Sequence, residues 1–101
     1  PPYTNEIPPM SKVEQLYVWI KSGVLARKEP FLKVGDTGER VKRVQQLLSL
    51  PQTGVYGKKE VEKVTAFQKL CKLDPNIYGR MNFKTWRQLI YFTFTKGRIR
   101  T

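Results

Sequence analysis

A short turn followed by an amphipathic helix occurs twice in the second half of the chain. The segment VYG at 55–57 aligns with IYG at 77–79, and the apolar positions that follow the two segments match without a gap. The matched pairs are Val61 with Phe83, Val64 with Trp86, and Phe67 with Leu89. Two Tyr-Gly pairs can arise by chance, but the shared apolar phase favours a true repeat. The repeat predicts two helices that pack in a related way.

Apolar residues at helical spacing extend this prediction to four helices, so the expected fold class is all-α. The expected helices lie at 11–23, from about 37 to 51, at 58–71 and at 82–92. Ser11 and Glu14 fit a capping box at the start of the first helix, and Gly23 is expected to end it. Asp36 is expected to cap the second helix.

The same spacing predicts which side chains face the core. The inward positions are Val13, Leu16, Tyr17 and Ile20 in the first helix, Val41, Val44, Leu47 and Leu48 in the second, Val61, Val64, Phe67 and Leu70 in the third, and Phe83, Trp86, Leu89 and Ile90 in the fourth. Gln45 and Gln68 lie on these otherwise apolar faces. We therefore expect their amides to bond to backbone groups of neighbouring loops.

Composition excludes several classes of function. The chain has 101 residues, which suits one domain, and it contains no His and one Cys, Cys71. Nucleophile pairs that need His, His-containing metal sites, an intramolecular disulfide and Cys-cluster zinc sites are therefore excluded. Asp36 and Glu39 could form an acid pair, but helix capping explains them better. We expect no catalytic residue, cofactor or metal, and no membrane span, because no apolar run approaches about 18 residues.

Both ends of the chain are expected to lie outside the packed domain. Residues 1–10 hold four of the seven prolines and are expected to form an extended arm or linker. The tail at 96–101 is short and basic, and we expect it to fray. The chain starts with Pro-Pro-Tyr, without a Met or a signal-peptide pattern, which indicates a processed product or a piece of a longer protein.

Four segments between residues 32 and 89 follow one another in a defined order. They are LKVGDTGERVKRVQQLL at 32–48, TGVYG at 53–57, AFQKLCKL at 66–73 and NIYGRMNFKTWRQL at 76–89. Their order and spacing resemble the small three-helix peptidoglycan-binding domain found on bacterial and phage cell-wall hydrolases. The resemblance implies a compact three-helix bundle at 31–95, preceded by an additional helix and connection at 11–30, and non-covalent attachment to the bacterial cell wall.

The last of these segments aligns with that family in two ways. An alignment on Lys84-Thr85-Trp86 needs an insertion of three positions, whereas one on Asn82-Phe83 needs none and keeps Tyr56 paired with Tyr78 in the internal repeat. We expect the gapless alignment to be correct. Departures from the family pattern, such as Thr53 in place of the turn Asp, bear on sugar binding more than on the fold.

The resemblance also implies a shallow ligand groove among the turns and helices. Its expected residues are Asp36, Arg40, Tyr56, Tyr78, Arg80 and Asn82. A Tyr at a turn can lay its ring on a sugar face and form a hydrogen bond through its hydroxyl. The alternative for both tyrosines is that the rings pack over the adjacent helix and anchor the turns.

Positive charge is concentrated toward the C-terminus. The chain has 19 Lys plus Arg against 8 Asp plus Glu, which gives a net charge of +11. Residues 75–101 contain no acidic residue, and their cations are Arg80, Lys84, Arg87, Lys96, Arg98 and Arg100. A solvated surface explains most scattered cations. A segment without acids suits an anionic polymer: peptidoglycan with its stem carboxylates, teichoic acid or nucleic acid.

These observations lead to one expected function and two alternatives. The chain is expected to be a non-catalytic peptidoglycan-binding module that targets an attached wall hydrolase, located at the cell wall outside the cell or in a phage particle. One alternative is a basic helical module that binds nucleic acid, although no predicted helix concentrates Arg, Lys, Asn and Gln on one face. The other is a phage virion or assembly protein that reuses the fold. The oligomeric state stays open.

Overall fold

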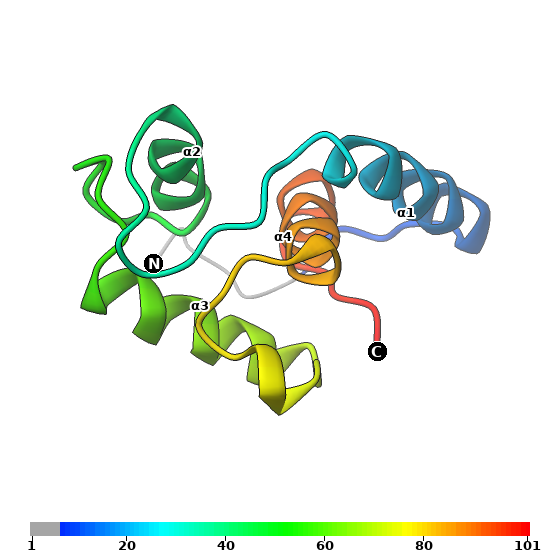
Figure 1. The fold of residues 1–101 in the computed structure, drawn as a ribbon. Coiled ribbons are helices and arrows are strands. Elements are labelled where there is room, and N and C mark those ends of the chain that lie inside the picture. Colours follow the sequence, from blue (N-terminus) through cyan, green and yellow to red (C-terminus); the bar gives the residue numbers. More distant parts are fainter. Residues whose placement is uncertain (1–6) are drawn as a thin grey trace, which may run out of the picture.

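The computed structural model describes residues 7–101, which form four α-helices around one apolar core (Figure 1). The helices are α1 (Lys12–Ala26), α2 (Glu39–Leu47), α3 (Lys58–Leu70) and α4 (Phe83–Thr95), with a short 3-10 helix, η1 (Pro75–Ile77), before α4. Figure 1 shows α4 between α1 on one side and α2 and α3 on the other. The predicted all-α class is confirmed, since the described residues contain no β-structure beyond two isolated bridges. None of these helices is long and apolar enough to cross a membrane.

Helix α1 begins as predicted but does not end at Gly23. Ser11 Oγ accepts a hydrogen bond from the Glu14 N–H at 3.1 Å, and the Glu14 carboxylate accepts one from the Ser11 N–H at 3.0 Å. Gly23 is buried within the helix, which continues to Ala26. A Cβ atom at residue 23 would lie 2.9 Å from Arg87 Cζ of α4. The glycine therefore permits the close approach of an α4 side chain instead of ending the helix.

The prediction for the inward face of α1 is wrong. The residues of the predicted stripe are 51–78% exposed, and they are Val13, Leu16, Tyr17 and Ile20. Helix α1 packs on α4 and buries Ser22, Gly23 and Ala26 instead. Small residues face α4 because α4 presents the large side chains of Arg87 and Tyr91 toward α1.

The turn–helix repeat is present, but its register differs from the one that the two Tyr-Gly pairs suggest. Gly57 and Asn82 are the N-cap residues of α3 and α4. Tyr56 and Met81, the residues just before these caps, are both fully buried. Tyr56 therefore corresponds to Met81 and not to Tyr78. The gapless alignment is wrong, and the observed register agrees with the alternative that contains an insertion.

The additional residues lie before the second turn. Helix η1 occupies Pro75–Ile77, and the first turn has no such helix. In the corrected register Gly54 and Gly79 are equivalent, and their positive φ angles are 76° and 85°. Phe83 then corresponds to Lys58 at the start of α3. Phe83 is accordingly 39% exposed and does not face the core as predicted.

Residues 32–37 join the two turns to each other. The Leu32 N–H donates to the Met81 carbonyl at 3.1 Å, and the Met81 N–H donates to the Leu32 carbonyl at 2.8 Å. A second isolated bridge pairs Thr37 with Val55. One extended segment therefore holds both turn–helix units side by side.

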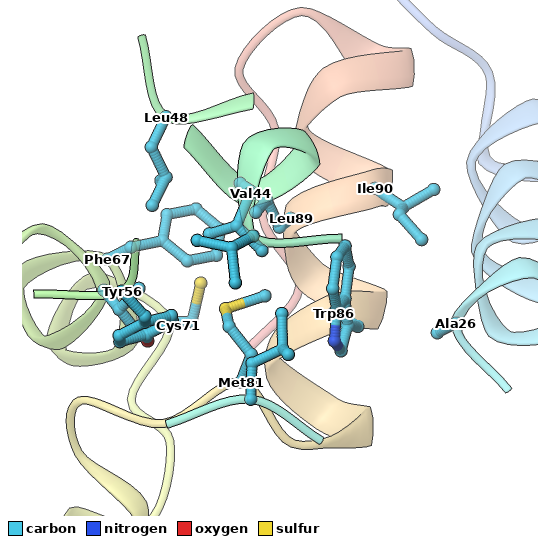
Figure 2. Packing of buried hydrophobic residues seen from close by; sticks show 13 residues of the cluster. Ala26, Val44, Leu48, Tyr56, Phe67, Cys71, Met81, Trp86, Leu89 and Ile90 are labelled. Atoms are coloured by element: carbon cyan, nitrogen blue, oxygen red, sulfur yellow. The ribbon is translucent and has the colours of Figure 1, made fainter. Parts of the chain in front are cut away.

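The core is built around α4 (Figure 2). Figure 2 shows Trp86 and Leu89 of α4 beside Val44 of α2 and Phe67 of α3. Trp86 is 1% exposed, and its indole N–H donates to the Pro30 carbonyl at 2.8 Å. The prediction that Trp86 is a core residue is confirmed. Its hydrogen bond also ties α4 to the connection that follows α1.

The C-terminal tail is held in place, so the prediction that it frays is wrong. The Arg100 N–H donates to Gln88 Oε1 at 3.0 Å, and the Gln88 amide donates back to the Arg100 carbonyl. Ile99 packs against the core, and the Arg98 guanidinium donates to the Pro8 carbonyl. Residues 1–6 of the predicted Pro-rich arm lie outside the described residues.

Candidate ligand-binding surface

The first turn is organised by the side chain of Gln45. Its Oε1 atom accepts a hydrogen bond from the Gly54 N–H at 3.0 Å. Its Nε2 atom lies 3.0–3.1 Å from three acceptors, which are Thr53 Oγ1, the Val55 carbonyl and Glu60 Oε2. A buried amide in the middle of the turn thus satisfies the polar groups that the turn would otherwise leave unpaired.

Gln68 repeats this arrangement in the second turn. Its Oε1 atom accepts from the Gly79 N–H at 2.8 Å. Its Nε2 atom lies 2.8–3.2 Å from the Ile77 carbonyl, the Arg80 carbonyl and Thr85 Oγ1. The prediction that both glutamines reach backbone groups of neighbouring loops is confirmed.

Tyr56 joins the two turns through its hydroxyl. The side chain is fully buried, and its O–H donates to the Gly79 carbonyl at 2.7 Å. Burial raises the pKa of Tyr56, and the carboxylates of Glu60 and Asp36 raise it further. The ring therefore has no face free for a sugar, and Tyr56 follows the alternative in which its ring anchors the turn and not its place in the expected groove. The reason is the register of the repeat, which gives Tyr56 the core position of Met81.

Tyr78 and Arg80 lie on the surface of the second turn. Tyr78 is half-buried, and Lys69 Nζ lies 5.7 Å from the centre of its ring. Arg80 is exposed. Asn82 is used as a helix cap, because its Oδ1 accepts from the Thr85 N–H at 2.9 Å and from Thr85 Oγ1 at 2.6 Å. Of these three predicted ligand-binding residues, Tyr78 and Arg80 have side chains that a ligand can reach.

Asp36 and Arg40 both have protein partners. Asp36 Oδ2 accepts from the Lys33 N–H at 2.9 Å, and its other oxygen lies 3.5 Å from Lys33 Nζ. Asp36 therefore does not cap α2 as predicted. That helix starts after Gly38, which has a φ of 120°, and no described side chain forms a capping hydrogen bond there. Arg40 forms an ion pair with Glu29 in the connection between α1 and α2.

The structure brings part of the predicted set together. The Tyr56 N–H donates to the Asp36 carbonyl at 2.9 Å, and the Tyr56 hydroxyl reaches the turn that carries Tyr78 and Arg80. Arg40 is directed to the α1–α2 connection through its ion pair with Glu29. Asp36, Tyr56, Tyr78 and Arg80 therefore meet at a junction of turns, whereas the exposed Arg40 is engaged by Glu29.

An apolar groove that the sequence analysis did not predict lies among α2, α3 and α4. It has a volume of about 620 Å³, and its lining includes Leu48, Lys63, Ala66, Leu70 and Phe92. Leu70 was expected to face the core, yet it is 56% exposed at this groove. Ala66 and Leu70 share one face of α3 at i, i+4 spacing, next to the position of Lys63. This spacing is the signal in the sequence that could have revealed the groove.

The cations of residues 75–101 have no acidic partners within the described residues. The three ion pairs described are Lys33 with Asp36, Arg40 with Glu29, and Lys42 with Glu39. All of them lie between residues 29 and 42. The described residues also contain no group of three or more His, Cys, Asp and Glu side chains that could hold a metal ion. The C-terminal part of the molecule therefore presents a positive surface.

No family model matches the chain, and no curated protein or solved structure matches it. The likeness to peptidoglycan-binding domains therefore rests on the segments at 32–48, 53–57, 66–73 and 76–89.

Proposed function

We propose that the chain is a non-catalytic module that binds peptidoglycan or an anionic polymer attached to it. The observation that carries the proposal is that residues of the family-like segments form hydrogen bonds that join the two turns. Gln45 and Gln68 each bind the glycine of their own turn, and Tyr56 ties the two turns together. The residues that resemble the wall-binding family thus act as one structural unit. A chance match of short segments would not require this.

The surface supplies chemistry that suits such a ligand. The groove at α2, α3 and α4 is apolar, with Lys63 among its lining residues, and it can receive methyl and acetyl groups. Arg80 and the other cations of residues 75–101 can attract carboxylates and phosphates. In this proposal the module holds an enzyme, encoded elsewhere in a longer parent, at the cell wall or in a phage particle.

The test is co-sedimentation with purified insoluble peptidoglycan, with and without its teichoic acid. Leu70→Glu places a charge in the groove and should abolish sedimentation with stripped peptidoglycan. Val24→Glu is the matched control, because Val24 is 52% exposed on α1 and does not line the groove, whereas Leu70 is 56% exposed on α3 within it. The control should sediment like the unchanged protein. If the unchanged protein sediments at low salt neither with stripped peptidoglycan nor with wall that retains its teichoic acid, the proposal is wrong.

Nucleic acid is the second candidate ligand. The acid-free basic segment at 75–101 and the net charge of +11 favour it. Binding to duplex DNA would weaken log-linearly with salt and would not compete with purified cell wall. Retention on DNA at moderate salt, together with no binding to peptidoglycan, would select this candidate.

A further inference from the structure

Arg87 lies at the contact between α1 and α4, where it is tied to Trp19. Its Nε and Nη2 atoms donate to the Trp19 carbonyl at 3.1 and 3.0 Å. Its Cζ atom lies 4.0 Å from the centre of the Trp19 ring, which is a cation–π contact. The space that Gly23 leaves on α1 accommodates the guanidinium. Arg87 is therefore fixed in position, and its Nη1 atom has no hydrogen bond within the described residues.

Arg100 reaches the same indole ring from the C-terminal tail. Its Cζ atom lies 5.3 Å from the centre of the Trp19 ring. The paired hydrogen bonds between the Arg100 backbone and the Gln88 amide hold the tail against α4. Two guanidinium groups from separate elements are therefore pre-positioned around one tryptophan.

The charges at this place are not compensated. No ion pair within residues 7–101 involves Arg27, Arg87 or Arg100. Burial lowers the pKa of Arg87, and repulsion from Arg27 and Arg100 lowers it further. A bound anion would relieve this repulsion, so the cluster favours a negatively charged ligand.

Two hollows lie on either side of the Gln88–Arg100 pair, since Gln88 lines one and Arg100 lines the other. The smaller has a volume of about 180 Å³ and is lined by Trp19, Leu73, Phe83, Lys84, Arg87 and Gln88. The larger has a volume of about 540 Å³, and its lining includes Lys12 and Arg100. Both hollows lie at the junction of α1, α4 and the tail, each has cations in its lining, and among the described residues neither lining contains an Asp or Glu side chain; the two hollows together are called the path below.

We propose that this path is a second binding site, specific for a phosphodiester chain of the polyol-phosphate type. Successive phosphates pair with Lys12, Arg100 and the Arg87–Lys84 end of the path, while the polyol carbons contact the apolar wall. The site depends on α1, which lies outside the three-helix domain that the sequence resembles. It is separate from the groove at α2, α3 and α4 and does not depend on peptidoglycan binding.

The aromatic residues argue against a single-stranded nucleic acid as the occupant. Proteins that bind single strands stack successive bases on open aromatic faces. The Trp19 ring already has Arg87 and Arg100 against it and Tyr91 at its edge, with ring centres 5.4 Å apart. Phe83 is then the remaining aromatic residue in the lining of the path. A phosphodiester chain without bases does not need an open aromatic face, so the covered Trp19 ring does not weaken its binding.

The test is an NMR titration that follows the two indole N–H signals. The probe is a short poly(glycerol phosphate) oligomer, compared with inorganic phosphate and with an oligothymidine of equal charge. The Trp19 signal should shift, whereas the Trp86 signal should not, because that N–H is bonded to Pro30 in the core. The oligomer should bind more tightly than inorganic phosphate, since several cations act on one chain.

Arg100→Gln removes one guanidinium and keeps the backbone bonds to Gln88. It should weaken oligomer binding about tenfold, the effect of losing one charge-assisted hydrogen bond. Lys59→Gln removes the same charge from an exposed position on α3 outside both proposed sites and should change the affinity less than about twofold. An unchanged Trp86 signal verifies that each variant is folded. Equal losses in the two variants, no shift of Trp19, or tighter binding of oligothymidine would each overturn the proposal.

Discussion

At the scale of single residues, two buried glutamine side chains organise this protein. Gln45 and Gln68 have no solvent exposure, and each holds one turn by four hydrogen-bond contacts. Each buried polar group left without a partner costs about 1–3 kcal/mol. These amides are therefore expected to matter more for stability than exposed polar residues of the same type.

Replacing Gln45 by Met tests this expectation. Methionine has nearly the same shape but cannot bond to the Gly54 N–H or to the Glu60 carboxylate. We expect the free energy of unfolding, measured in urea, to fall by about 2–4 kcal/mol. Gln46→Met is the control, because Gln46 is exposed on the same helix and its side chain bonds only to Arg43 within the described residues. Equal effects of the two changes would contradict the structural role of Gln45.

The two turn tyrosines should respond differently to loss of the hydroxyl group. Tyr56→Phe leaves the Gly79 carbonyl without its buried partner and should lower the free energy of unfolding by about 1–2 kcal/mol. Tyr78→Phe should change it by less than about 0.5 kcal/mol, because Tyr78 is half-buried and its hydroxyl has no hydrogen bond within the described residues. Thermal unfolding of the two variants provides the measurement. A larger effect at Tyr78 would contradict the register that pairs Tyr56 with Met81.

Stability should fall at alkaline pH because two buried groups resist ionisation. Burial raises the pKa of the Cys71 thiol from 9.0 to about 11, and burial also raises the pKa of Tyr56. Above pH 9.0 the unfolded chain loses the Cys71 proton while the folded chain keeps it, so the stability contribution is full below pH 9.0 and is lost as the pH rises toward 11. The melting temperature should therefore decrease between about pH 8.5 and about pH 10.5, where the unfolded chain ionises before the folded one. Cys71→Ala should make this decrease shallower, and an unchanged slope would show that the thiol does not contribute.

At the scale of single elements, α1 shows which helix face tertiary packing selects. Ile20→Gln should change the free energy of unfolding by less than about 0.5 kcal/mol, because Ile20 is 55% exposed. Ala26→Gln should cost about 2 kcal/mol or more, since Ala26 is 1% exposed and a longer polar side chain has no space there. Urea unfolding of both variants gives the comparison. The opposite order would mean that the predicted apolar stripe, and not the small-residue face, packs on α4.

At the scale of the whole molecule, net charge should oppose folding. The charge of +11 repels itself more strongly in the compact state than in the unfolded chain. Raising NaCl from about 20 mM to about 200 mM shortens the range of this repulsion and should raise the melting temperature by a few degrees. Lys63→Glu should raise the melting temperature at low salt, and Glu62→Lys, at the exposed neighbouring position, should lower it. A melting temperature that falls with salt would show that attractive ion pairs outweigh the repulsion.

The sequence by itself determined the features that depend on neighbours along the chain. The capping box of Ser11 and Glu14, the existence of four helices and the burial of Trp86 were all predicted correctly. A cap joins residues three positions apart, and apolar spacing reports a helix without knowledge of its partner. The bonding of Gln45 and Gln68 followed in the same way, because a polar residue on an apolar face must find partners.

Tertiary structure alone decided the features that join distant segments. The face of α1 depends on Arg87 crossing Gly23, and the anchored tail depends on the bonds between Gln88 and Arg100. The true register of the repeat and the burial of Tyr56 depend on η1, which displaces the second turn from the spacing that the two Tyr-Gly pairs suggest. In each case several faces or registers satisfy the local pattern equally well. The choice among them is made by packing and hydrogen bonds between residues far apart in the chain, and the local pattern carries no information about these contacts.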